Sequence, residues 1–129
     1  MHTDLTLFRL ATAKAEHAAG RQTIVAQNLA NADTPRYKAR DLPPFSEVLA
    51  AASPATEMRV VHPAHFKMGL SGPLPDARAQ ELPGNEAPNG NSVSIETEMI
   101  RASEIRHDHD MALTVYHSGL KLLRAAIGN

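Results

Sequence analysis

The 129-residue sequence contains no cysteine and no tryptophan, and its other aromatic residues are three phenylalanines and two tyrosines. Without cysteine the chain cannot form disulfides, thiolate zinc sites or a cysteine nucleophile. The net charge of −1 provides no global positive field that would recruit nucleic acid or an anionic membrane. Its apolar runs fall short of the ~20 residues that a membrane span needs. The first residues lack the basic and apolar segments of a signal peptide, so we expect no cleaved signal.

Proline is missing from both ends of the chain. All nine prolines lie between Pro35 and Pro88. A proline inside a helix costs roughly 3 kcal/mol, so the two ends can form long helices and the middle cannot. We therefore predict one elongated, all-α domain with an N-terminal helix in 1–34, a Pro/Gly-rich middle in 35–91 and a C-terminal helix in 92–129.

Both ends repeat apolar residues with the alternating steps of three and four that are typical of coiled coils. The first helix is expected over about 3–32, with Thr3 or Asp4 as its cap, and the second over about 92–127, with Ser92 as its cap. We predict that the two helices pair as an antiparallel coiled coil. The residues expected to pack these helices are Phe8, Val25, Leu29, Ile95, Met99, Leu113, Tyr116, Leu120 and Leu123.

The middle segment is expected to be largely irregular and partly disordered, because turn-forming residues interrupt it throughout. The stretch EMRVVH, residues 57–62, favours a short β element, and 71–91 reads as flexible loop. Two paired helices with an alanine-rich stripe offer little core for a chain of this size. We therefore expect the ends to fold fully only when they assemble with other chains.

The first helix is expected to end in the stretch QNLANADTPRY, residues 27–37. Asn28 and Asn31 lie three residues apart and face similarly on the last turn. The residue before a proline is pushed out of helical geometry, and Asp33 is expected to close an Asx turn. The pattern fits a simple polar helix end, or an elbow whose side chains bond a neighbouring subunit. The elbow residues are Gln27, Asn28, Asn31, Asp33, Thr34, Pro35 and Tyr37.

At this point the sequence resembles a known family. The stretch QTIVAQNLANADTPRYKARDLPPF resembles the N-terminal signature of flagellar axial proteins, specifically the proximal rod proteins of the bacterial basal body, the FlgB family. The stretch PNGNSVSIETEMIRASEIRHDHDMALTVYHSGLKLLRAAI is similar to that family's C-terminal helix. Together the two halves are specific, whereas either half alone would suggest only the wider rod and hook group. Arg36 departs from the family, which commonly has glycine there, and a positive φ is costly for arginine.

The resemblance implies a structural subunit and not an enzyme, with no catalytic residues, cofactor, metal or small-molecule substrate. It implies self-association through the terminal helices into a hollow tube that transmits torque across the periplasmic space. The implied partners are other rod proteins, the rod base at the membrane ring and the flagellar type III export apparatus, with no nucleic acid. A different axial component, or a soluble helical adaptor or export chaperone, stays as an alternative.

A metal-dependent hydrolase is the third alternative, because the stretch EIRHDHD gathers ligand-type residues at 104–110. Glu104, His107 and Asp108 share one helix face, but His107 and His109 point to nearly opposite sides. Diiron bundles need matching carboxylates on facing helices, and the first helix offers none at a comparable spacing. His109 is better placed to be a polar residue in the helix stripe, where it would set register or respond to pH.

Overall fold

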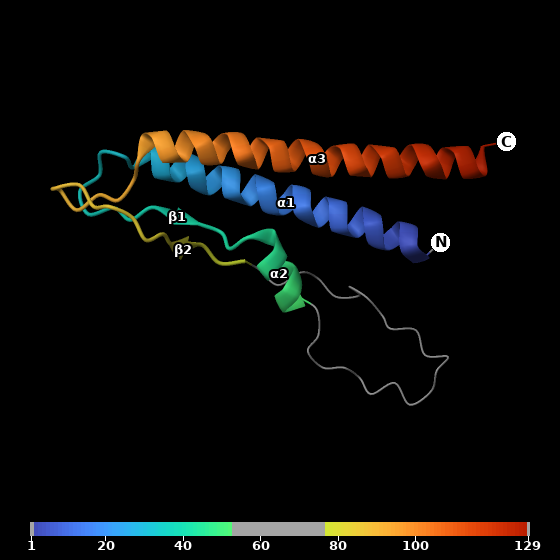
Figure 1. The fold of residues 1–129 in the computed structure, drawn as a ribbon, viewed down its shortest axis with the longest axis horizontal. Coiled ribbons are helices and arrows are strands. Elements are labelled where there is room, and N and C mark those ends of the chain that lie inside the picture. The colour runs from blue at the N-terminus through green and yellow to red at the C-terminus, as the bar shows by residue number, and fades with distance from the viewer. Residues whose placement is uncertain (1, 53–76, 129) are drawn as a thin grey trace, which may run out of the picture.

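The computed structural model describes residues 2–52 and 77–128. Two long helices, α1 (His2–Ala30) and α3 (Ile95–Ile127), lie side by side and run in opposite directions, so both termini lie at one end of the molecule (Figure 1). Between them in sequence come β1 (Arg40–Asp41), α2 (Phe45–Ala52) and β2 (Gln80–Glu81). The expected fold is confirmed: two long terminal helices pack against each other, and the middle holds a small β element.

The starts of both long helices differ from the prediction. Thr3 and Asp4 lie inside α1 and do not cap it. α3 begins at Ile95, and its cap is Ser94, whose hydroxyl accepts a hydrogen bond from the Thr97 N–H at 3.4 Å. The expected cap, Ser92, instead accepts the Ala39 N–H at 2.9 Å. The helix starts later because the segment before it is bonded to the chain that leaves α1.

The contact between α1 and α3 is built on a seven-residue repeat of mostly small side chains. Buried positions seven residues apart are Ala11, Ala18 and Val25 in α1, and Glu98, Ile105, Ala112 and Gly119 in α3. A repeat of seven is the period of a coiled-coil seam. At the end near the termini the rings of Phe8 and Tyr116 meet edge to face, with centroids 5.1 Å apart. A Cβ at Gly119 would lie 3.0 Å from the Phe8 ring, so glycine permits this close crossing.

The residues expected to pack the helices fall into two groups. Val25 is buried, Phe8 and Tyr116 contact each other, and Leu120 and Leu123 are half-buried. The other four, Leu29, Ile95, Met99 and Leu113, are exposed, with Met99 at 64%. Small residues and Glu98 occupy the seam, so the large apolar side chains of the expected stripe lie to one side of it. For these four residues the role in helix packing stays a prediction.

The described part of the middle segment is more regular than expected. β1 and β2 pair antiparallel, with Arg40 opposite Glu81 and Asp41 opposite Gln80. The helix α2 was missed; it follows Pro44, whose fixed φ suits a helix start, and its Val48 is buried. The expected β element at 57–62 and residues 71–76 of the expected loop lie outside the described residues, whereas 77–91 holds β2 and a hydrogen-bonded turn.

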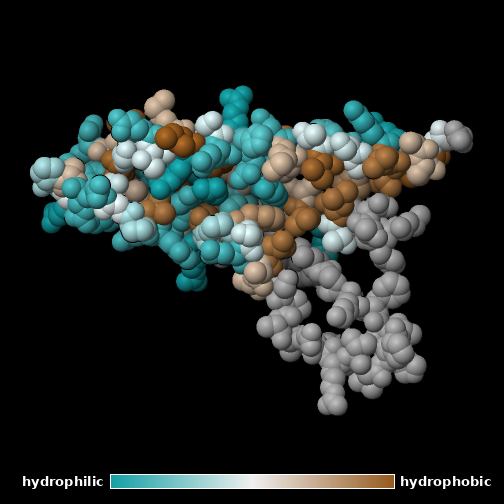
Figure 2. Space-filling view, in the orientation of Figure 1, coloured by the Kyte–Doolittle hydropathy of each residue, from teal (hydrophilic) through white to brown (hydrophobic). Residues whose placement is uncertain are grey.

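Apolar and polar surface are unevenly divided along the molecule. Figure 2 shows apolar residues gathered over the half that holds the termini, whereas the opposite end, where α1 ends and α3 begins, is mainly polar. In the described part of the chain no helix has the length and apolar character needed to cross a membrane.

Candidate assembly site at the elbow

The elbow, residues 27–37, turns the chain back after α1 through hydrogen bonds between residues three or four positions apart. The Asn31 N–H donates to the Gln27 carbonyl at 3.1 Å, and the Thr34 N–H donates to the Asn31 carbonyl at 3.0 Å. The Asn31 side chain adds a bond to the Gln27 carbonyl at 2.8 Å, and its oxygen accepts the Thr34 hydroxyl at 3.2 Å. The Tyr37 N–H then donates to the Thr34 carbonyl at 3.3 Å. Gln27, Asn31 and Thr34 thus build a local turn on the surface.

Asn28 has a different role, because its side chain is completely buried. Its Nδ2 donates to the Arg40 carbonyl at 2.7 Å and to Glu98 Oε2 at 3.0 Å. Its Oδ1 accepts the Arg40 N–H at 3.1 Å and the Tyr37 hydroxyl at 3.3 Å. A side-chain amide has two donor hydrogens and two acceptor lone pairs, so all four are used. Asn28 therefore joins α1, the returning elbow and α3 at one point.

Glu98 completes this buried layer from the first turns of α3. Its side chain is 1% exposed, and its second oxygen accepts the Arg101 Nη1 at 2.5 Å. A buried carboxylate is costly unless charged or hydrogen-bonding partners surround it, and here Asn28 and Arg101 supply them. The sequence analysis did not identify Glu98 as a buried residue. Its seven-residue spacing from Ile105 was the signal that it faces α1.

Asn91 links the turn before α3 to the end of α1, and sequence reasoning missed it. Its buried amide donates to the carbonyls of Asn31 at 2.9 Å and Thr34 at 2.8 Å. Its oxygen accepts the Val93 N–H at 2.7 Å. The two carbonyls that follow the end of α1 thus share one partner, a side chain that lies 57 to 60 positions away along the chain. Nothing in the local spacing of Asn91 predicts that contact.

Arg36 adopts the left-handed conformation, with φ of 62°. An arginine therefore adopts the positive φ that glycine adopts readily, and this conformation costs on the order of 1–2 kcal/mol. The Arg36 N–H donates to the Asn89 carbonyl at 3.1 Å, and Gly90, with φ of 80°, lies against it. A Cβ at Gly90 would come within 3.4 Å of the Arg36 Cα. Gly90 thus allows the two backbone segments to approach closely enough to hold Arg36 in this geometry.

The chain after the elbow runs back along α1, and an ion pair fastens it there. Arg21 Nε donates to Asp41 Oδ1 at 2.9 Å and Arg21 Nη2 to Oδ2 at 2.6 Å, a bidentate pair. Burial raises the pKa of Asp41, but the Arg21 hydrogen bonds and charge, with the Leu42 N–H, outweigh it and hold that pKa below its usual value. The bond to Asp41 raises the pKa of Arg21.

His17 holds the same segment one turn further along α1. Its Nε2 donates to the Pro43 carbonyl at 2.9 Å, and its ring lies against Phe45 with centroids 5.5 Å apart. Gly20 sits under Leu42, whose Cδ1 would be 3.2 Å from a Cβ at that position. We call residues 39–48 the strap, because these contacts tie them along α1.

The seven predicted elbow residues are therefore not equivalent. Asn28 and Tyr37 lie in the buried layer, and Gln27, Asn31 and Thr34 form the surface turn. Pro35 and Asp33 are exposed, and the Asp33 side chain makes no hydrogen bond with another described residue. The expected Asx turn was wrong for a physical reason: its acceptor would need the N–H of residue 35, which is a proline.

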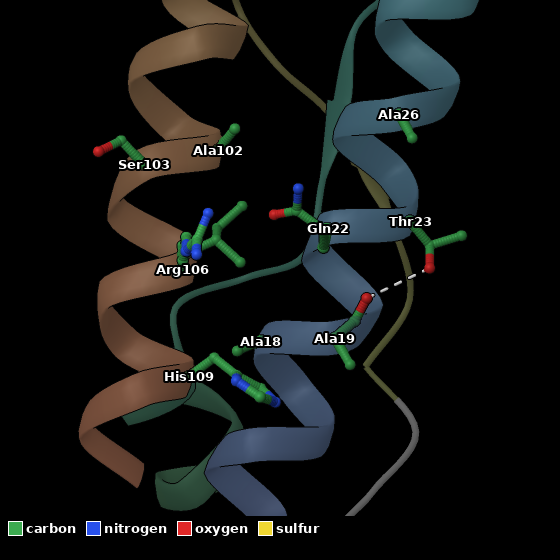
Figure 3. Close-up of a pocket in the computed structure, with 10 residues that line it drawn as sticks. Ala18, Ala19, Gln22, Thr23, Ala26, Ala102, Ser103, Arg106 and His109 are labelled. Atoms are coloured by element: carbon green, nitrogen blue, oxygen red, sulfur yellow. Dashed lines mark hydrogen bonds between the residues drawn. The ribbon is translucent and has the colours of Figure 1, made fainter. Parts of the chain in front are cut away.

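A shallow groove of about 870 Å³ runs between α1 and α3 beside the seam (Figure 3). Small side chains form much of its wall, and they are Ala18, Ala19, Ala26, Ala102 and Ser103. Its polar lining is Gln22, Thr23, Arg106 and His109. We call it the helix groove.

The ligand-type residues of 104–110 are spread around α3. Asp108 pairs with Lys14 of α1 at 3.3 Å, and His109 lines the helix groove with its Nδ1 3.8 Å from Asp110. In the described residues no three His, Asp or Glu side chains come together as a metal site would require.

The sequence of the chain is similar to those of known flagellar proteins. A family described as flagella basal body rod protein matches residues 16–38, from the middle of α1 through the elbow. The flagellar basal body rod protein FlgB of Agrobacterium fabrum is 35% identical over 88% of this chain and 87% of its own length. FlgB of Cereibacter sphaeroides is 36% identical over 72% of this chain and 73% of its own length. FlgB of Salmonella typhimurium is 32% identical over 80% of this chain and 79% of its own length. With such identity along most of both chains, the chain belongs to the FlgB family of flagellar basal body rod proteins.

Proposed function

We propose that the chain is a structural subunit of the proximal rod of the bacterial flagellar basal body, and that it assembles through its terminal helices into a hollow, torque-transmitting tube. Its FlgB relatives, which are named as basal body rod proteins, support this role. The one structural observation that carries it is the buried layer of Asn28 and Glu98, to which the backbone of Arg40 is hydrogen-bonded. That layer fixes the angle at which the chain leaves the paired helices, as a subunit that transmits torque requires.

The small core of the single chain also supports a role in assembly. The buried apolar side chains of the described residues are four alanines, two valines and one isoleucine. Such side chains contribute less hydrophobic stabilisation than the large residues that usually fill a core. Ile95, Met99 and Leu122 meanwhile stay more than half exposed. A chain that buries small apolar side chains and exposes large ones is suited to burying the large ones against neighbouring subunits.

The proposed role also implies specific partners and a cellular location for the subunit. The subunit acts without catalysis and without a cofactor, contacts other rod proteins above it and the rod base at the membrane ring below it, and lies in the periplasmic space. It reaches that place through the flagellar type III export apparatus, with no cleaved signal peptide. A chain without disulfides suits export in an unfolded state.

The test is deletion of the gene in the bacterium that encodes the chain, followed by complementation and isolation of basal bodies. We expect the deletion to abolish swimming, the intact gene to restore it, and antibody labelling to find the chain in the rod of the isolated basal bodies. Complementation by a chain that is absent from purified basal bodies would support the soluble adaptor or chaperone instead.

A further inference from the structure

The helix α3 carries two stripes with coiled-coil spacing on opposite sides. The groove stripe consists of Ile95, Met99, Ala102, Arg106, His109 and Leu113. The ridge consists of Glu104, Asp108, Met111, Val115, Ser118 and Leu122. Each member of the ridge follows a member of the groove stripe by nine residues, and nine residues are about two and a half turns of an α-helix. The two stripes therefore face in opposite directions.

The helix groove has room for side chains larger than its own. Its small wall residues come from both helices, with Ala19 and Ala26 on α1 and Ala102 on α3, as Figure 3 shows. Exposed apolar side chains continue it toward the elbow, where Met99 and Leu29 are 64% and 36% exposed. Small residues let a further helix approach closely, and the apolar edges would be buried with it.

The ridge offers the large side chains that the groove lacks. Met111, Val115 and Leu122 are 43%, 38% and 71% exposed. Their spacing of four and seven residues puts them in one row along the second half of α3. This row lies to one side of the buried positions Ile105, Ala112 and Gly119, so the seam of the single chain does not bury it. A row of large apolar knobs on the same chain as a groove of small residues is a complementary pair of surfaces.

The charges of the two surfaces are also complementary. The helix groove contains the guanidinium of Arg106, whereas the ridge begins with the carboxylates of Glu104 and Asp108. Asp108 already pairs with Lys14, but neither Glu104 nor Arg106 has a hydrogen bond or an ion pair with another described residue. Opposite charges at the ends of apolar surfaces help to set orientation and register.

From these observations we infer that the ridge of one copy of the chain packs into the helix groove of the next copy. The inference rests on the proposed function, since it names the contact through which subunits would assemble. The ridge and the groove are different surfaces on opposite sides of α3. A contact of this kind is heterologous, so each added copy leaves one groove and one ridge free for continued growth, and no closed two-fold dimer results.

Crosslinking in assembled rods tests this contact, and the chain has no cysteine of its own to interfere. Cells would produce two forms of the chain together, Ala26→Cys in the groove and Val115→Cys in the ridge, and their isolated basal bodies would be treated with a short bismaleimide reagent. We expect a crosslinked dimer when both forms are present and little dimer from either form alone. A single chain carrying both substitutions should give a ladder of larger products.

The matched control replaces the groove residue by Glu16→Cys, an exposed position of α1 that does not line the groove. It should give at most a trace of dimer with Val115→Cys. Should a first pair impair swimming, Ala19→Cys with Met111→Cys probes the same contact at other positions.

Two results would overturn the inference. One is the absence of mixed crosslinks in basal bodies from swimming cells for both pairs, and the other is efficient crosslinking of Ala26→Cys to itself, which indicates a groove-to-groove dimer. Swimming of the same cells shows that the rod has assembled. The proposed function can therefore stand while this contact fails, and the two failures are distinguishable.

Discussion

Among single residues, Asn28 and Asn31 have opposite roles although they lie three positions apart. Asn28 is buried and bonded to two other elements of the fold, whereas Asn31 bonds mainly to the turn in which it stands. Removing Asn28 would leave the Glu98 carboxylate and the backbone groups of Arg40 without their partner in a dry site. Buried groups without partners are much more costly than exposed ones.

We therefore predict that Asn28→Ala lowers the free energy of unfolding by about 2–4 kcal/mol. Asn31→Ala is the matched control and should cost only about 0.5–1 kcal/mol, as the loss of a helix-end side chain does. Urea unfolding followed by circular dichroism would measure both, at a chain concentration where the unmodified protein unfolds cooperatively. Equal costs for the two variants would contradict a special role for the buried layer.

The sequence pointed to both asparagines but could not separate them. Their difference depends on Glu98, 70 residues away along the chain, and on the carbonyl of Arg40. Arg36 is similar: its positive φ was expected to be costly, and the structure keeps it because Asn89 and Gly90 lie against it. Long-range neighbours decide the conformation of single residues that local rules leave open.

At the scale of elements, the strap depends on α1 for its position. The pair of Arg21 and Asp41 is largely buried, with side chains 18% and 8% exposed. Since the folded chain holds the pKa of Asp41 below its ordinary value, this pair stabilises the fold at neutral pH. The stabilisation is present above the unfolded pKa of about 3.9 and is lost as the pH falls through the lower folded value.

We predict that Asp41→Asn lowers the free energy of unfolding by about 1–3 kcal/mol at pH 7, because Arg21 loses a charged partner. The difference in the free energy of unfolding from the unmodified chain should hold at mildly acidic pH and shrink only as the pH falls below the unfolded pKa of about 3.9 and then through the lower folded pKa, where Asp41 loses its charge in the folded chain too. Urea unfolding at each pH gives this difference. Asp33→Asn, at an exposed site, should change stability little at any pH. A difference in the free energy of unfolding between Asp41→Asn and the unmodified chain that stays constant with pH would contradict the role of the ion pair.

The periodic pattern predicted the two long helices because each carries more than seven turns of it. It failed for α2, β1 and β2, which are short. β1 and β2 are two residues each, and they pair because the elbow brings 40–41 beside 80–81. The predicted stripe on α3 lies to one side of the seam, since a search for large apolar residues passes over a seam in which Glu98, Ala112 and Gly119 accompany a single isoleucine.

For the whole molecule, the decisive property is the contrast between a small core and a long exposed surface. The residues described bury mostly small apolar side chains, whereas Ile95, Met99, Ile100, Leu122 and Ile127 are more than half exposed. The folded state of a single chain therefore has little hydrophobic stabilisation to offset the entropy of ordering two long helices.

We predict that the purified chain gains helicity as its concentration rises. Far-UV circular dichroism over a wide concentration range, with sedimentation on the same samples, would measure helicity and mass together. Low helicity in dilute solution that increases with the size of the particle is the expected result, because helices that are marginal alone are stabilised by packing. A compact, fully helical particle at the lowest concentration would instead favour the soluble adaptor.

Local sequence patterns were enough to predict the all-α class, the proline-free ends that form the two long helices, and the position of the elbow, because helix periodicity, proline chemistry and helix-end residues act over a few neighbouring positions. Only the tertiary structure decided that Asn28 is buried, that Glu98 and Asn91 complete the elbow, and that the strap lies along α1. Those facts depend on which distant groups meet when the helices run antiparallel, and a burial or hydrogen bond between residues 60 or 70 positions apart leaves no periodic trace in the chain.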